Sequence, residues 1–192
     1  MTGVLPGRFR LRLPNRRASR SAAAVAGACL MFVGLVLIAC TAGDYGVAWD
    51  DYVQSRYGEL VLDYFLSGGH DRACNEFLDL KFYAPTFEIV AAAAARILPE
   101  QAIEVRHVLC GLVALLAVPP LVGFGRLLGR PWLGVIASVM LFLCPVFYGH
   151  ALINSKDVPF AVGFTWSMYA LAAMFAKDEF KWREALGAGL AV

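Results

Sequence analysis

Two short polar stretches hold the side chains best suited to catalysis. The first reads Trp49-Asp50-Asp51-Tyr52 and places two carboxyl groups next to each other. A carboxylate acts as a general base when it lies within hydrogen-bonding reach of the proton that it removes and has a suitable pKa. An adjacent acid raises the pKa of such a group and a nearby arginine lowers it. The competing interpretation is that Asp50 only caps the helix that follows, which is a common role for aspartate.

The second stretch covers residues 149–159 and contains His150, Lys156 and Asp157. We expect Asp157 and His150 to face a cavity at the membrane surface, and Lys156 to face an anionic group. Simpler interpretations stay open for all three. Asp157 could cap a helix that has Pro159 in its first turn. Lys156 could anchor a helix end at a membrane surface, and His150 could be an ordinary hydrogen-bonded residue.

The remaining candidates are isolated cations. Basic side chains can bind phosphate, although most of those near apolar segments only mark the membrane interface. These cations are Lys81, Arg72, Arg106 and His107.

Cysteine and histidine give no metal motif. The sequence contains no C-x-x-C pair and no His/Cys spacing typical of zinc. We therefore expect no cofactor, and a divalent metal stays open without any motif to support it. Cys74 is the one cysteine in a polar stretch, and a single loop cysteine cannot form a disulfide framework.

The composition indicates which kind of molecule must position these residues. Of 192 residues, 59% are hydrophobic and 17% are charged, and the mean hydropathy is +0.62. Soluble domains are less apolar and more charged. The composition excludes a disordered chain, a basic nucleic-acid-binding domain and a typical cytosolic enzyme. It predicts an all-α polytopic membrane protein, with the lipid bilayer as a partner and no nucleic acid.

Four windows are long and apolar enough to span a bilayer, which takes about 20 residues. A fifth apolar run begins at Ala185 and reaches Val192, so we expect a truncated fifth span in a fragment of a longer protein. The four complete windows are Ser21–Gly43, His107–Gly125, Pro131–Ser155 and Val158–Ala176.

Charge bias predicts the orientation. Residues 1–20 contain six arginines and no acid, so we expect a basic cytoplasmic tail. Residues 21–192 then form the amino-terminal part of one transmembrane domain, with external loops at about 44–105 and 150–158. This requires that Ala84–Leu98, which is short for a span, lies at the interface. Asp50 and Asp157 then share the non-cytoplasmic face, and the arginines at 126 and 130 face the cytoplasm.

Two further expectations concern the start of the chain and the first external loop. Leu37-Ile38-Ala39-Cys40 matches a lipoprotein cleavage box, but the apolar core before it is long for a signal peptide. We therefore expect a retained span in a multi-pass protein of a bacterial-type inner or plasma membrane. After Asp51, apolar residues recur at helical spacing from Val53 to Tyr64. This pattern predicts an amphipathic helix on the membrane or against the spans.

The order of these features resembles the GT-C membrane glycosyltransferases. An arginine-rich start and one span precede W-D-D-Y and R-Y-G-E-L, and then K-F-Y-A-P-T-F-E-I, R-H and G-H-A-L-I-N-S-K-D-V-P-F follow. The nearest resemblance is to the protein O-mannosyltransferases and to the aminoarabinose transferases that act on lipid A. It covers nearly the whole chain and implies a GT-C-like helical bundle.

The resemblance also implies roles for individual residues. An acidic pair, commonly Asp-Glu, opens the first external loop of that family, and Asp50 matches its proposed catalytic base while Asp51 replaces the glutamate. Asp157 matches the acid of the second external loop. Lys81 is the best match to the cations that contact the lipid phosphate, and Arg56 is a looser one. His150 belongs to the pattern without an assigned role.

The implied reaction moves a sugar from a polyprenyl-phosphate-linked donor to a hydroxyl acceptor on a protein, lipid or glycan. An anionic phosphate leaves, so nearby cations can stabilise the developing charge. Lys156 is a further candidate for that contact. The alternatives are a transporter and a non-catalytic membrane assembly subunit. Transporters carry charges inside their spans near the midplane, whereas here the ionisable residues cluster in the predicted external loops.

Overall fold

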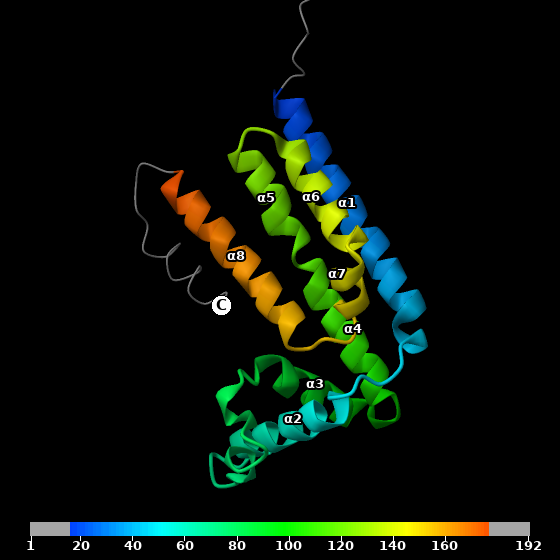
Figure 1. Ribbon diagram of the computed structural model, residues 1–192, viewed down its shortest axis with the longest axis vertical. Helices are drawn as coiled ribbons and strands as arrows, with labels where there is room; N and C mark the ends of the chain where they lie inside the picture. Colours follow the sequence, from blue (N-terminus) through cyan, green and yellow to red (C-terminus); the bar gives the residue numbers. More distant parts are fainter. Residues whose placement is uncertain (1–15, 177–192) are drawn as a thin grey trace, which may run out of the picture.

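The computed structural model describes residues 16–176, and this part of the chain is helical with no strand. Long apolar helices form a bundle, and two shorter helices form a layer across one end of it (Figure 1). The α-helices are α1 Arg16–Thr41, α2 Asp51–Leu66, α3 Thr86–Ile97, α4 Ala102–Leu115, α5 Val118–Leu127, α6 Pro131–Leu143, α7 Pro145–His150 and α8 Asp157–Phe175. Short 3-10 turns are η1 Ala42–Asp44, η2 Ala73–Asn75, η3 Leu80–Phe82 and η4 Pro99–Gln101.

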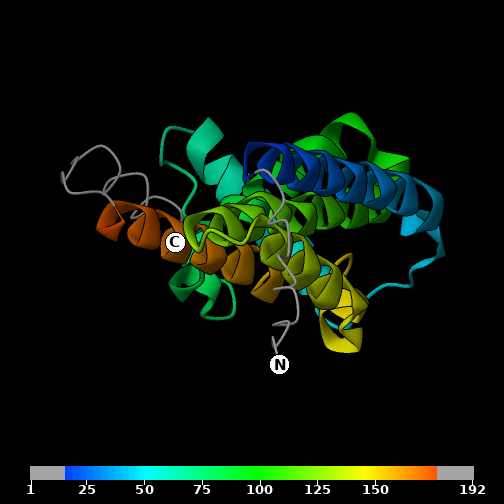
Figure 2. The same cartoon turned by 90° about the horizontal axis from the view of Figure 1, so that it is seen from above.

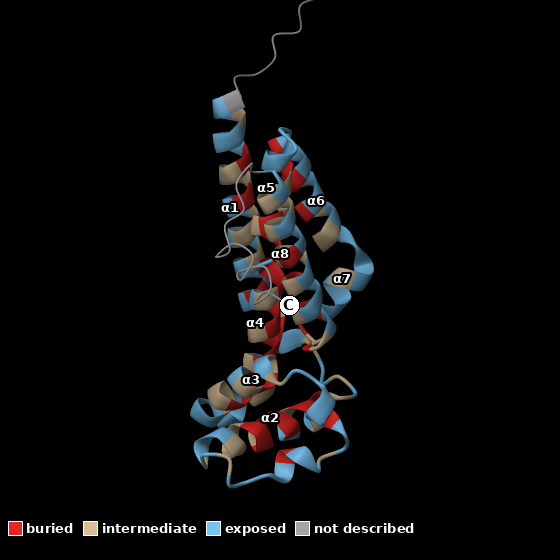
Figure 3. Cartoon of the chain, turned by 90° about the vertical axis from the view of Figure 1, so that its left-hand side faces the viewer, coloured by how far each residue is buried: buried red, intermediate tan, exposed pale blue. Residues whose placement is uncertain are grey.

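Three segments of the described chain are long and apolar enough to cross a membrane: Arg17–Asp44, Pro99–Leu127 and Asp157–Phe175. They agree with three of the four predicted windows and support a membrane protein. Seen along the bundle (Figure 2), the middle segment, formed by α4 and α5, lies between α1 and α8 and contacts both. Buried residues line the inner sides of these helices (Figure 3).

The middle segment is interrupted where α4 gives way to α5. Pro119 and Pro120 follow the break, and proline has no backbone N–H to donate to the carbonyl four residues earlier. The carbonyl of Leu116 would face Pro120, and it instead accepts a hydrogen bond from the indole Nε1 of Trp166 at 2.8 Å. Trp166 belongs to α8, so the interruption also ties two apolar segments together.

The single span expected over Pro131–Ser155 is not confirmed. Its helix α6 has 13 residues, or about 20 Å at 1.5 Å per residue, which is shorter than the apolar core of a bilayer. Cys144 then adopts an extended conformation, with φ −69° and ψ 117°. The residue before a proline disfavours the helical conformation, and Pro145 follows. The apolar run from Ala185 lies outside the described residues.

The predicted amphipathic helix is confirmed as α2. Its apolar face packs against the protein's own loop and not against the membrane. Tyr57, Leu60 and Val61 form a buried cluster with Cys74 and Leu80 from the loop beyond the helix. The layer therefore has its own small core. Helix α3, at 12 residues, packs against α2 and is not among the segments able to span, as expected for Ala84–Leu98.

Candidate functional site

A buried network of charged side chains joins the layer to the bundle. Arg106, in the second turn of α4, donates through Nη1 and Nη2 to the two carboxylate oxygens of Glu88 at 2.6 and 2.9 Å. Its Nε donates to Asp51 Oδ1 at 3.2 Å, and Nη2 also donates to Ser155 Oγ at 2.6 Å. Ser155 Oγ in turn donates to Glu88 Oε1 at 2.8 Å. One guanidinium therefore connects α2, α3, α4 and the loop before α8.

All the members of this network are withdrawn from solvent. Arg106 is 2% exposed, Glu88 3% and Asp51 1%. Buried charges are costly unless they are paired and hydrogen-bonded, and here every charge has partners. Glu88 is fixed by close packing as well, because a Cβ on Gly58 of α2 would lie 2.5 Å from the backbone oxygen of Glu88.

An accessible ion pair lies beside the network. Asp50 Oδ2 and Lys156 Nζ are 2.5 Å apart, with 39% and 38% of their side chains exposed. Each is the sequence neighbour of a network residue, Asp51 or Ser155, so the network sets the separation of the pair. The hydrogen bond from Lys156 lowers the pKa of Asp50, against the opposing effect of partial burial.

The helix-cap interpretation of Asp50 is not supported. Asp50 occupies the N-cap position of α2, but its side chain makes no capping hydrogen bond. The carboxylate of Asp51 instead accepts a hydrogen bond from the backbone N–H of Ala48 at 2.6 Å. Asp51 is buried and fully engaged, so its expected place among the residues that meet a substrate is corrected to a structural one. Asp50 is the member of the pair that remains accessible.

Asp157 is exposed in the first turn of α8. Its Oδ2 accepts a hydrogen bond from Asn154 Nδ2 at 2.9 Å. Asn154 Oδ1 accepts from the backbone N–H groups of Lys156 and Asp157, at 3.2 and 2.9 Å, so Asn154, two residues before the N-cap Lys156, satisfies N–H groups at the start of α8. His150 Nδ1 lies 3.4 Å from Asn154 Nδ2. The second polar stretch thus folds into one hydrogen-bonded loop that presents Lys156.

The two predicted phosphate-binding cations of the first loop make local contacts. Arg56 pairs with Glu59 on its own helix at 2.8 Å. Lys81 is exposed, with its Nζ 5.5 Å from the centre of the adjacent Phe82 ring. The segment around Lys81 nevertheless reaches the site, because the Lys156 ammonium lies 5.9 Å from the centre of the Tyr83 ring.

Three other cations were considered for phosphate. Arg72 is exposed, and its Nε donates to the carbonyl oxygen of Gly69 at 3.5 Å. Arg106 is buried, with its guanidinium bound to protein side chains. His107 is fully buried, and its Nδ1 lies 3.0 Å from the carbonyl oxygen of Ala42. Arg106 and His107 are therefore unavailable to an external phosphate, whereas Lys156 is accessible.

Sequence reasoning missed the roles of Glu88, Ser155 and Asn154. A usable signal was present for Glu88 and Arg106, because each interrupts or borders an otherwise apolar segment. Charges in such segments are expected to find partners of opposite sign. Serine and asparagine in a loop carry no comparable signal.

An apolar groove leads to the network from the bundle. It is lined by α1, α3, α4 and Pro159, with Leu35, Phe87 and Leu112 among its walls, and encloses about 950 Å³ including space open to the surroundings. The ring centre of Phe87, one of its walls, is 5.6 Å from Arg106 Cζ. The groove is therefore an apolar surface that borders the buried network at Phe87.

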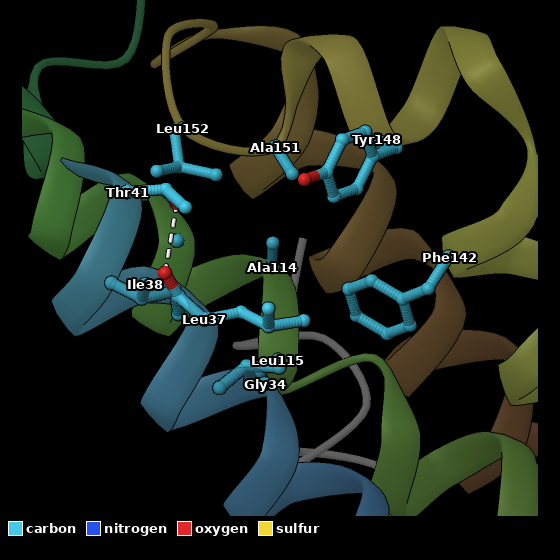
Figure 4. Close-up of a pocket in the computed structure, with 11 residues that line it drawn as sticks. Gly34, Leu37, Ile38, Thr41, Ala114, Leu115, Phe142, Tyr148, Ala151 and Leu152 are labelled. Atoms are coloured by element: carbon cyan, nitrogen blue, oxygen red, sulfur yellow. Dashed lines mark hydrogen bonds between the residues drawn. The ribbon is translucent and has the colours of Figure 1, made fainter. Parts of the chain in front are cut away.

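A second, smaller cavity lies between α1, α4 and the α6–α7 segment (Figure 4). Its walls are mostly apolar, and the hydroxyl group of Thr41 in it donates to the carbonyl oxygen of Leu37 at 2.8 Å. Leu115 of α4 borders both cavities. Of the two cavities, the groove includes Phe87, which lies next to Arg106. The groove is therefore the better place for a substrate of the site.

Within residues 16–176, no group of three or more His, Cys, Asp or Glu side chains could hold a metal ion. Comparison with protein-family models, with curated proteins and with solved structures finds no match for the chain. The function is therefore inferred from the residues and geometry of the site.

Proposed function

We propose that the full-length protein is a membrane glycosyltransferase that moves a sugar from a polyprenyl-phosphate-linked donor to a hydroxyl acceptor. The observation that carries the proposal is the accessible Asp50–Lys156 pair, 2.5 Å apart, at one end of an apolar helical bundle. It offers a base and a cation at the same place. The motifs that resemble GT-C enzymes contain both residues and support the same reaction.

The chemistry follows from the charges of this pair. Asp50 accepts the proton of the acceptor hydroxyl as its oxygen attacks the anomeric carbon of the donor. The bond between that carbon and the phosphate oxygen breaks, and the phosphate leaves with the bonding electrons. Lys156 stabilises the negative charge that develops on the phosphate. The hydrogen bond from Lys156 lowers the pKa of Asp50, so the carboxylate becomes a stronger base when the ammonium turns from it to the phosphate.

The other residues fall into supporting roles. Arg106, Asp51, Glu88 and Ser155 position the pair without meeting the substrate. Asp157 is exposed, one residue beyond Lys156. It can contact the acceptor or groups next to the leaving phosphate. Lys81 lies two residues from Tyr83, which contacts Lys156, and is a further cation for the phosphate.

The apolar groove gives the donor lipid a place. A polyprenyl chain is entirely apolar, and the groove is lined by α1, α3 and α4 with almost no polar surface. Phe87 connects this lining to the site through Arg106. In the proposed orientation the α2–α3 layer faces the non-cytoplasmic side of a bacterial-type membrane.

The placement of the charges favours surface chemistry over a transporter. Arg106, the member of the network that belongs to α4, lies in the second turn of that helix, beside the α2–α3 layer and not midway along the apolar segments. Transport pathways place their ionisable groups near the midplane.

Sugar release and transfer test the proposal directly. The full-length protein in liposomes would be given radiolabelled polyprenyl-phosphate sugars, with nucleotide sugars as the comparison. We expect release or transfer of sugar from the lipid-linked donors alone. Absence of turnover with every lipid-linked donor, or turnover with nucleotide sugars, would contradict the assignment.

A further inference from the structure

The Asp50–Lys156 ion pair, which carries the proposed function, also occupies the carboxylate oxygen that would act as the base. Lys156 Nζ lies 2.5 Å from Asp50 Oδ2, so the oxygen that would accept a proton already accepts a hydrogen bond from an ammonium group. A base in this state has to lose that partner before it can bind the acceptor hydroxyl. The question is what removes Lys156.

Lys156 is built to move while its backbone stays in place. Its N–H donates to Asn154 Oδ1 at 3.2 Å, and the preceding Ser155 is bound to Arg106 and Glu88. Its side chain, in contrast, is 38% exposed. While Nζ is paired with Asp50 it also lies 5.9 Å from the Tyr83 ring centre, a contact that favours a cation on this side of the site. The ammonium can therefore change partners without any rearrangement of the fold.

Arg106 cannot take this part. It is buried and its guanidinium donates to three different side chains. Lys156 is a flexible point charge with one carboxylate partner, and exposed ion pairs of this kind are weak. The diester phosphate of the donor carries one negative charge, as a carboxylate does, and gains more as the sugar leaves, so it competes with Asp50 for the ammonium.

We propose that Lys156 is an exchangeable counter-ion, which the phosphate of the bound lipid donor draws away from Asp50, so that the base becomes free only when the donor is in place. This inference rests on the proposed function and adds an order of events to it. Donor binding precedes activation of the acceptor. Without a donor, Asp50 stays paired with Lys156. No bond is made or broken in the exchange, and the ammonium keeps its proton.

The exchange predicts that loss of a carboxylate tightens binding, and only when Lys156 is present. The probe is a polyprenyl monophosphate, titrated into the full-length protein in nanodiscs of zwitterionic lipid, with the uncharged polyprenol as the comparison. In Asp50→Asn, no competition for Lys156 remains, and we expect the Kd to fall by about two- to fivefold, the range set by the strength of exposed ion pairs. In Lys156→Met the Kd rises.

The double variant separates exchange from simple repulsion. If Asp50 merely repels the phosphate, Asp50→Asn tightens binding by the same factor with or without Lys156. Under exchange, the gain disappears in the Lys156→Met background, and Lys156→Gln gives the same result as a second test. Asp63→Asn is the matched control, because Asp63 pairs with Arg96 at 2.5 Å with 39% of its side chain exposed, and we expect no change in its Kd.

Each remaining outcome has a definite meaning. The exchange is overturned if Asp50→Asn lowers the Kd by the same factor with Lys156 and in the Lys156→Met background, or if it does not lower the Kd at all. In either case, phosphate binding by the wild type leaves the proposed function standing. A wild-type protein that binds the phosphate no better than the polyprenol overturns both. Thermal unfolding of each variant confirms that the layer is folded.

Discussion

Asp50 and Asp51 are neighbours in the sequence with opposite surroundings. Asp51 is 1% exposed and bound to Arg106 and to the backbone of Ala48. Asp50 is accessible and paired with Lys156. Helix α2 begins at this point, so consecutive side chains diverge, one toward the network and one toward the site. The buried acid thereby positions the catalytic candidate beside it.

Removal of Lys156 should change the pH dependence of the reaction. The hydrogen bond and charge of Lys156, with a smaller effect of Arg106, lower the pKa of Asp50. Activity that needs the carboxylate is lost as the pH falls through this pKa. In Lys156→Met the pKa rises, so the acidic limb of the kcat/KM profile moves to higher pH, which initial rates across a pH series would measure. An acidic limb that stays in place would show that Asp50 is not the titrating group.

The network predicts an order of stability among its variants. Arg106→Gln leaves the buried carboxylates of Asp51 and Glu88 without their countercharge, and breaking a buried pair in this way costs about 3–5 kcal/mol. Glu88→Gln keeps the pair between Arg106 and Asp51 and should cost less. Unfolding of the detergent-solubilised protein checks the order, and equal midpoints for the two variants would show that the charges are not coupled as described.

At this scale the sequence identified the chemistry-bearing stretches but not their arrangement. Asp50, Lys156 and Asp157 were recognised from residue type and local pattern, and the structure brings Asp50 to Lys156 across 106 positions of sequence. The distinction between Asp50 and Asp51 depends on where α3 and α4 place Glu88 and Arg106. No local pattern contains that information.

Among the elements, the contact between α2 and α3 matters most for the site. Alanine at Gly58 would put a Cβ 2.5 Å from the backbone oxygen of Glu88, and backbone cannot move aside as a side chain can. We expect Gly58→Ala to destabilise the protein by about 1–3 kcal/mol, the usual cost of overpacking, and to weaken the Arg106–Glu88 contact.

A matched control for this variant exists in α7. Gly149 is also helical, and a Cβ there would meet nothing within 4 Å. Gly149→Ala should be neutral or stabilising by up to about 1 kcal/mol, because alanine favours the helix. If the two variants unfold at the same temperature, the close approach of α2 to α3 is not required.

The hydrophobic pattern predicted a helix correctly where the apolar residues form one uninterrupted or regularly spaced run. The segments corresponding to α1, α2 and α8 were anticipated, since length and periodicity are local properties. The window over Pro131–Ser155 was not confirmed, because the break at Cys144 is caused by Pro145, a signal that average hydropathy ignores. The role of Trp166 at the α4–α5 break depends on packing and has no sequence signature.

The whole molecule is polarised along the bundle. The α2–α3 layer and the site lie at one end, and the turn between α5 and α6 lies at the other, together with the start of α1 (Figure 1). The arginines near that start and at 126 and 130 would face the cytoplasm by the positive-inside rule. The site would then lie on the opposite side of the membrane.

Labelling from one side of a cell membrane tests this polarity. His70 in the layer and Leu128 in the α5–α6 turn are both exposed. With a membrane-impermeant maleimide added outside, we expect His70→Cys to be labelled and Leu128→Cys to be labelled only after the cells are opened. The protein without an added cysteine serves as the control. Labelling of both positions in intact cells would contradict the orientation.

The central claim is that Asp50 is the base of a lipid-linked sugar transfer, and the rate of its variant tests it most directly. Turnover of a polyprenyl-phosphate sugar by Asp50→Asn would be compared with that of Asp63→Asn, which removes an equally exposed carboxylate from α2. We predict that kcat falls by at least about 100-fold for Asp50→Asn, the scale of a lost general base, and stays near the wild-type value for Asp63→Asn. Wild-type turnover by Asp50→Asn would contradict the account.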